Sequence, residues 1–307
     1  MRRTALAMLG PATLAIGAAA EPPERIVQHG ETVAVSVNGV PGRLRIEPGA
    51  PGLMILTDRY AASAGLQGGG MLGFGIIYHV GDQTVKTATS VARVSVNGAR
   101  SGKRRVGWAA RPYRAGAEAV VGPGGLDAPV VRFVLHAPAA GERTVALPMA
   151  DGGLFGGWGG TRATLTIGGE PVLVRFDPDH RRTVANAVAG QRIAEVLGGR
   201  LQGTASGEEI AFGIARPVRT LVLARPLAIG PLSLDRMGVR TVPDRPGDAG
   251  PAIADATDPA ADPDEVVVVG RKGKRRAATL TLGADQLARC SSILFDKRAR
   301  QIRLSCI

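Results

Sequence analysis

Apolar and polar residues alternate along most of this chain in short runs, a pattern typical of β-strands that bury one face. One run, TVAVSVNGVPGRLRIE, covers residues 32–47 and has an Asn-Gly pair at its centre. Such a pair predicts a tight hairpin turn between two strands. A second run, RATLTIGGEPVLVRFD, covers residues 162–177 and turns at a Gly-Gly pair. Both runs end in an acidic residue, which is Glu47 in the first and Asp177 in the second.

These two runs begin a pattern that occurs twice. A short Ala-rich stretch with helical character follows each acidic residue, as TDRYAASAGL and as ANAVAGQRIAEVLGG. Each copy then has a strand that ends at a turn glycine, Gly98 or Gly230, and closes with two apolar residues, a glycine (Gly122 or Gly283) and a strand. Because these features recur in the same order, we predict an internal duplication.

The composition favours an all-β chain. Its 307 residues can bury a substantial core, and its 43 glycines and 21 prolines favour short strands joined by turns. We expect an N-terminal lobe over residues 21–140 and a C-terminal lobe over residues 141–307. Residues 243–265 are rich in Pro, Asp and Ala without an apolar period, which predicts a disordered insertion in the second lobe.

Residues 1–20 have the pattern of a secretory signal peptide. Two arginines precede a short apolar run, and three alanines up to Ala20 offer a small-residue cleavage site. We therefore expect cleavage near Ala20, a secreted or periplasmic mature chain, and no transmembrane span within it.

The formal net charge is +12, and a tight basic run, RKGKRR, covers residues 271–276. Such charge on an exported protein allows peripheral contact with an anionic envelope surface, although dispersed arginines more often form a solvated surface. Aromatic residues make up only 4% of the chain, so stacking platforms are scarce and we expect no nucleic-acid partner.

The two cysteines lie in CSSILFDKRARQIRLSC, where alternation predicts a hairpin that turns near Arg298. Pairing Asp296 with Arg300 also places Cys290 opposite Cys306, at a separation that a disulfide can bridge. Export favours this disulfide, and a buried pair of free thiols is the alternative.

The duplicated order of strand, hairpin, strand, acidic turn, helix and apolar-apolar-glycine resembles the two lobes of aspartic peptidases, in their retropepsin-like and pepsin-like bacterial versions. The resemblance covers Thr32 to Leu304 apart from the insertion, and LTLGADQL with ILFDKRARQIRL is among its more specific matches. It implies two pseudo-symmetric β lobes around a central cleft, with short helices. It also implies one carboxylate from each lobe, the two sharing a proton so that one activates water and the other polarises the scissile carbonyl.

On this mapping Glu47 and Asp177 take the catalytic positions, but the family pattern Asp-Thr/Ser-Gly is lost around both. The triplets read EPG at residues 47–49 and DPD at residues 177–179. Glutamate moves the carboxyl oxygens by more than about 1 Å, against a tolerance of about 0.5 Å in a catalytic site. The prolines remove the bracing hydroxyls, and Asp179 is expected to bring a second carboxylate beside Asp177.

The family's flap maps onto residues 67–85, where Tyr78 is the only tyrosine. The resemblance implies that Tyr78 and Gly49 contact substrate, although a strand tyrosine more often packs in a core. We expect no metal and no cofactor, because the four histidines lack metal-ligand spacing. His180 is interpreted as a surface residue.

Three functions are compatible with these residues. The degenerate triplets favour an inactive relative of the peptidases that binds peptide or unfolded polypeptide in its cleft. An active aspartic-type endopeptidase that uses a Glu47/Asp177 pair in acid is an alternative. A structural or interaction protein of the cell envelope is another.

Overall fold

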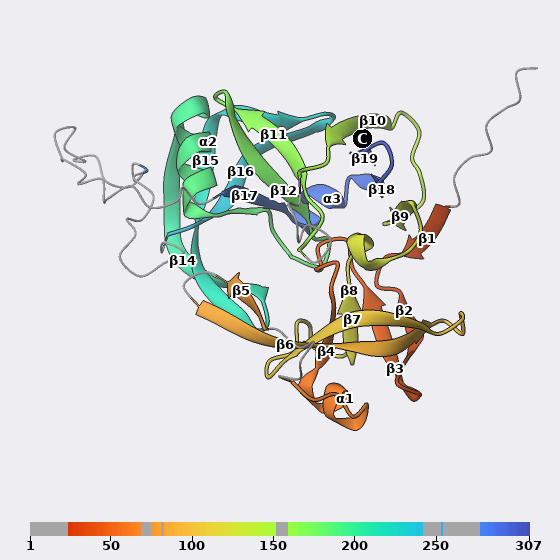
Figure 1. Ribbon diagram of the computed structural model, residues 1–307. Helices are drawn as coiled ribbons and strands as arrows, with labels where there is room; N and C mark the ends of the chain where they lie inside the picture. The colour runs from red at the N-terminus through yellow and green to blue at the C-terminus, as the bar shows by residue number, and fades with distance from the viewer. Residues whose placement is uncertain (1–23, 69–74, 81–82, 152–158, 242–252, 254–276) are drawn as a thin grey trace, which may run out of the picture.

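A computed structural model gives the arrangement of the chain (Figure 1). It describes residues 24–68, 75–80, 83–151, 159–241, 253 and 277–307. The predicted signal peptide and the basic run at 271–276 lie outside these residues, as does the predicted insertion at 243–265 except for Ile253.

The chain is all-β, as predicted, and its strands form two sheets of seven strands and one of five. The first sheet contains, in spatial order, β2 (Thr32–Val37), β3 (Val40–Ile46), β8 (Ala119–Val121), β4 (Met54–Thr57), β7 (Gly102–Ala109), β6 (Gln83–Val96) and β5 (Ile76–Val80). The second sheet contains β11 (Ala163–Ile167), β12 (Glu170–Phe176), β17 (Ala278–Leu282), β13 (Val184–Ala185), β16 (Leu232–Arg240), β15 (Ile214–Ile229) and β14 (Gly199–Ala211).

These two sheets have one strand order. When the seven strands of each sheet are numbered along the chain, both sheets read 1-2-7-3-6-5-4. The seventh strand, β8 or β17, inserts between the second and third strands and pairs in parallel with the second. The predicted internal duplication is therefore confirmed by the topology. The strand order is the same although the hairpins β5–β6 and β14–β15 differ in length.

The third sheet combines strands from distant parts of the sequence. Its order is β1 (Glu24–Gln28), β9 (Val130–Val134), β18 (Cys290–Asp296), β19 (Gln301–Cys306) and β10 (Arg143–Pro148). In Figure 1 it lies at the upper right, with the first sheet below it and the second at the upper left. The predicted boundary between lobes, at residues 140–141, falls between β9 and β10 and stays a prediction.

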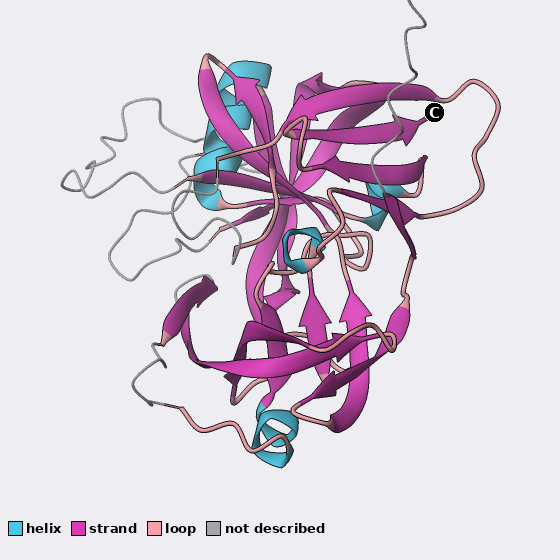
Figure 2. Cartoon of the chain, turned by 45° about the vertical axis from the view of Figure 1, so that its right-hand side comes forward, coloured by secondary structure: helices cyan, strands magenta, loops and turns pink. Residues whose placement is uncertain are grey.

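Helices are few and short (Figure 2). The two Ala-rich stretches form α1 (Asp58–Ser63) and α2 (Ala187–Leu197), and the side chains of Thr57 and Asn186 cap their N-termini. Shorter turns, η1 (Pro123–Gly125) and α3 (Ala284–Leu287), follow β8 and β17. No helix among the described residues has the length and apolar composition needed to cross a membrane.

The predicted disulfide between Cys290 and Cys306 is present, but the register of its hairpin differs from the prediction. Asp296 pairs with Gln301 instead of Arg300, and Arg300 lies in the turn with a φ of 54°. A bulge directly after Cys290 compensates for this shift of one residue and restores the pairing of the cysteines.

Replacement of both cysteines by alanine is expected to lower the free energy of unfolding by about 3 kcal/mol, because the bond closes a loop in the unfolded chain. The loop separation is 16 residues and both cysteines are fully buried. Urea denaturation with and without reductant measures the effect. The double variant is the control, since reductant should leave its curve unchanged. Equal stability of both proteins without reductant would contradict the prediction.

Candidate functional site

Glu47 and Asp177 directly follow equivalent strands, β3 and β12, and their turns are held by equivalent hydrogen bonds. The backbone N–H of Glu47 donates to the carbonyl oxygen of Val121 over 3.0 Å. The N–H of Asp177 donates to the carbonyl oxygen of Leu282 over 2.9 Å. Each acid also accepts a bond at its carbonyl oxygen from the third residue further on. The duplication thus includes the two positions that the resemblance assigns to catalysis.

The glycine of each apolar-apolar-glycine segment packs directly behind an acidic turn. A Cβ atom at Gly122 would lie 2.0 Å from the carbonyl oxygen of Ala50, and one at Gly283 would lie 2.4 Å from the carbonyl carbon of Arg182. Both distances are shorter than any tolerated contact, so only glycine fits. The threading of these segments behind the acidic turns, which the resemblance implies, is therefore present in both copies.

A single guanidinium group joins the two acids. Arg114, in the loop between β7 and β8, donates from Nε to Glu47 Oε2 over 3.2 Å. Its Nη2 lies 2.9 and 2.7 Å from Asp177 Oδ1 and Oδ2. The acids are almost fully buried, with 3% of Glu47 and 2% of Asp177 exposed. A cation therefore bridges the two carboxylates that would share a proton in an aspartic peptidase.

Two further arginines complete the network, one from each copy of the repeat. Arg45 Nε lies 2.8 Å from Glu47 Oε1 as an ion pair. Arg175 Nη2 lies 2.8 Å from Asp177 Oδ2. Each arginine precedes its acid by two positions, in the tripeptides RIE and RFD. Because residues two apart on a strand share a face, this repeated spacing is a signal that could have revealed the ion pairs.

Burial and charge act against each other in this network. Burial raises the pKa of Glu47, and Arg114 opposes that shift. Burial would lower the pKa of Arg114, but Asp177 and Glu47 together hold it above its ordinary value. Arg114 therefore stays a cation at any working pH.

Asp179, which was expected to bring a second carboxylate beside Asp177, forms ion pairs with Arg45 and His29. It extends the network outward, with Oδ2 at 2.8 Å from Arg45 Nη2 and Oδ1 at 3.2 Å from His29 Nε2. The hydrogen bond from His29, helped by Arg45, lowers the pKa of Asp179 to about 2. The same hydrogen bond raises the pKa of His29.

His180 is buried, so its interpretation as a surface residue is wrong. Its Nδ1 lies 2.7 Å from the carbonyl oxygen of Arg182, and its Nε2 lies 2.8 Å from that of Glu209. Glu209 belongs to β14, which covers the turn after β12. Burial by a strand nearly thirty positions away gives no local signal in the sequence.

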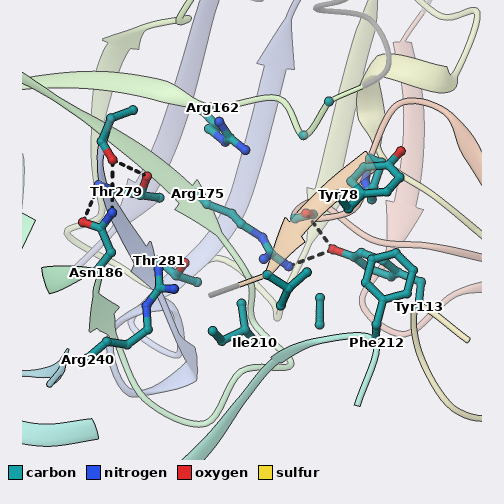
Figure 3. A pocket seen from close by; sticks show the side chains of 17 residues that line it. Tyr78, Tyr113, Arg162, Arg175, Asn186, Ile210, Phe212, Arg240, Thr279 and Thr281 are labelled. Carbon is teal, nitrogen blue, oxygen red and sulfur yellow. Dashed lines mark hydrogen bonds between the residues drawn. The ribbon is translucent and has the colours of Figure 1, made fainter. Parts of the chain in front are cut away.

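A cavity of about 310 Å³ lies between the first and second sheets, beside the network (Figure 3). Gly49 and Tyr78, the two predicted substrate contacts, both line it. A Cβ atom at Gly49 would lie 2.8 Å from Arg175 Nε, so the glycine allows the two chains to approach closely. Tyr78 lies on β5 of a hairpin with β6, where the flap was mapped, although residues 69–74 and 81–82 of that segment lie outside the described residues.

The tip of the β14–β15 hairpin crosses from the second sheet to the first. Phe212 at this tip is 2% exposed, and its backbone N–H donates to the carbonyl oxygen of Tyr113 over 3.2 Å. Its ring lies 5.7 Å from that of Tyr78 and 5.1 Å from that of Tyr113, centroid to centroid. In Figure 1, β14 extends down to β5. The hairpin equivalent to the flap therefore closes one side of the cavity.

Among the residues that the structure describes, no group of three or more His, Cys, Asp or Glu side chains could hold a metal ion. The site is thus a set of ion pairs beside a cavity. The carboxylate oxygens of both acids are in contact with arginine side chains.

Comparison of the sequence with protein-family models and with curated proteins gives no match. Among solved structures, the chain is similar to the EIAV protease complexed with the inhibitor HBY-793. The identity is 22%, the match covers 36% of this chain and 88% of that chain, and the TM-score is 0.23. A similarity of this size carries no argument about what this chain does.

Replacement of Arg114 by methionine is expected to lower the free energy of unfolding by about 3–5 kcal/mol, because two buried carboxylates lose their common partner. Urea denaturation measures the loss. Arg111→Met is the matched control, since Arg111 is an exposed residue of the same loop. Adding Asp177→Asn to Arg114→Met should recover part of the stability. A loss equal to that of the control would show that the bridge contributes nothing.

The contact between His29 and Asp179 makes stability depend on pH. The pKa of His29 is higher in the folded protein than in the unfolded chain, where it is about 6.5. The contact with Asp179 therefore stabilises the fold fully below about pH 6.5, and this contribution is lost as the pH rises through the pKa of the folded state. The lowered pKa of Asp179 stabilises above its ordinary value of 3.8 and is lost as the pH falls towards 2. Asp179→Asn should therefore destabilise the protein more at about pH 5.5 than at about pH 8.5.

Thermal unfolding of both proteins at the two pH values measures this difference. His29→Gln should remove most of the pH dependence, and Asp127→Asn, at an exposed ion pair with Arg104, is the control. An equal effect of Asp179→Asn at both pH values would rule out the His29 contribution.

Proposed function

We propose that this chain is an exported protein of aspartic-peptidase-like architecture that binds polypeptide between its two seven-stranded sheets without hydrolysing it. The loss of hydrolysis rests on one observation, the bridge from Arg114 to Glu47 and Asp177. Hydrolysis by two carboxyl groups requires that one be protonated and the other activate a water. Arg114 occupies the oxygens through which the acids would share that proton.

The architecture supports the relationship to aspartic peptidases. The two sheets have one strand order, the two acids follow equivalent strands, and a glycine segment threads behind each acidic turn. These are the features that the sequence resemblance implies. At the site itself, the departures from the pattern are the two triplets, EPG and DPD, and the arginines that contact the acids.

Polypeptide binding is supported by the strands that border the cavity. Both β5 and β14 lie at the ends of their sheets, and within the described residues neither pairs with a further strand on its outer side. Edge strands present free backbone N–H and C=O groups to which an extended peptide can add. Tyr78 and Val80 of β5, and Ile210 and Ala211 of β14, all line the cavity.

Export is the third part of the proposal. The disulfide between Cys290 and Cys306 supports an oxidising compartment, because such bonds persist there and are rare in the cytosol. Cleavage near Ala20 and a secreted or periplasmic location follow from the sequence pattern alone. Contact of residues 271–276 with an anionic envelope surface stays a prediction.

The protein is expected to bind an unfolded protein and to leave it uncut between about pH 3 and pH 7. Binding is followed by the fluorescence anisotropy of a labelled, reduced and alkylated protein, and cleavage is followed by gel electrophoresis. Glu47→Gln and Asp177→Asn are the controls for catalysis. Cleavage that both variants abolish would identify an active peptidase with a Glu47/Asp177 pair, and absence of binding by the folded protein would refute the proposed role.

A further inference from the structure

The lining of the cavity between the sheets is rich in arginine. It includes Arg162, Arg175 and Arg240 and no Asp or Glu. Arg175 is paired with Asp177, whereas the side chain of Arg162 has no hydrogen bond or ion pair to another described side chain. The Nε atoms of Arg162 and Arg175 are buried without an acceptor. Burial of Arg162, together with the neighbouring charge of Arg175, lowers its pKa.

Arg162 as a residue is half-buried, but its buried Nε atom lacks an acceptor, which costs free energy that a bound anion would recover. Arg162 directly precedes β11, and Figure 3 shows its side chain among those that line the cavity, on the same side of the view as Arg175. On the adjacent strand Thr281 lies opposite Arg175 in the register, and Thr279 shares its face. The second sheet therefore contributes a cationic and hydroxyl-bearing wall.

Another part of the lining is mostly apolar, apart from the Tyr78 hydroxyl group, which is buried without a hydrogen-bond partner. It contains Tyr78 and Val80 from β5 and Ile210 and Phe212 from the β14–β15 hairpin, with the Tyr78 and Phe212 rings in contact. The cavity thus offers one region suited to an anion and another suited to an apolar side chain. Its volume of about 310 Å³ is at the small end for ligand sites.

The cavity is closed towards the acidic turns. Tyr113 is buried there, and its hydroxyl group lies 3.3 Å from the carbonyl oxygen of Gly49 and 3.0 Å from Arg175 Nη2. Phe212 packs on Tyr113 from the other sheet. A chain that enters along the edge strands cannot continue past these groups, so the cavity suits the end of a chain better than its middle.

We propose that the cavity binds the carboxyl-terminal residue of a polypeptide, with the terminal carboxylate on Arg162 and an apolar last side chain against Tyr78 and Phe212. This inference rests on the proposed function, since it names the part of the polypeptide that is held. Carboxylates and guanidinium groups form charge-assisted hydrogen bonds, which are stronger than neutral ones. An Asp or Glu side chain has the same chemistry, and the test separates the two sources.

The test uses an octapeptide that ends in leucine, has no acidic side chain and carries a fluorescent label at its N-terminus. Its affinity for the full mature chain is measured by fluorescence anisotropy. Amidation of its carboxyl end should weaken binding by about tenfold or more, because one charge-assisted hydrogen bond is lost. Arg162→Met should weaken binding of the free acid by a similar factor and leave the amidated peptide unaffected.

Arg298→Met is the matched control, since it removes one positive charge from an exposed turn far from the cavity. The ligand-free Arg162→Met protein should be at least as stable to urea as the parent, so a folding defect cannot imitate lost affinity. Equal binding of free and amidated peptides would overturn the inference and leave polypeptide binding intact. An amidated peptide with one internal Asp that binds through Arg162 would also overturn it, in favour of a side-chain carboxylate. Absence of binding by any peptide or unfolded protein would reject the proposed function as well.

Discussion

The structure depends on the ion pairs that Arg114 makes with Glu47 and Asp177. Two carboxylates approach each other from separate sheets with almost no exposure to water, an arrangement that their repulsion would disfavour without a cation between them. Arg45 and Arg175 add one further contact each, so both acids have arginines on both oxygens. A buried ion-pair network stabilises a protein only when each of its charges has a partner. The contacts of Arg114 with both acids therefore hold its loop against both acidic turns.

In this duplicated fold the arrangement of the backbone does not by itself determine the chemistry of the side chains at the site. The backbone brings two strand ends together with a glycine segment behind each, as the resemblance to aspartic peptidases implies. The side chains then determine whether a proton can be shared there. With arginine two positions before each acid and a third from a loop, the same geometry holds an ion-pair network instead. The fold therefore determines where the site lies, but it does not determine what activity the site has.

Much of the fold could be predicted because it depends on local patterns. Alternation and turn glycines located the strands, and the repeated order predicted the duplication. The hairpin of Cys290 and Cys306 was predicted with a wrong register, because a bulge leaves no trace in alternation. The acids were found, but Arg114 and Phe212 were not, since their positions depend on contacts with distant parts of the chain. His180 was misjudged for the same reason.

The arginines of this site extend from the two acids to the cavity. Three arginines line it, and the acid that pairs with one of them, Arg175, lies outside the lining. The Nε atom of Arg162 is buried there without a hydrogen-bond acceptor. In the proposal above, an anion that binds Arg162 would supply the missing acceptor and stabilise the folded protein. In this proposal neighbouring arginines have two roles: Arg114 and Arg175 hold the acids, and Arg162 would hold the ligand.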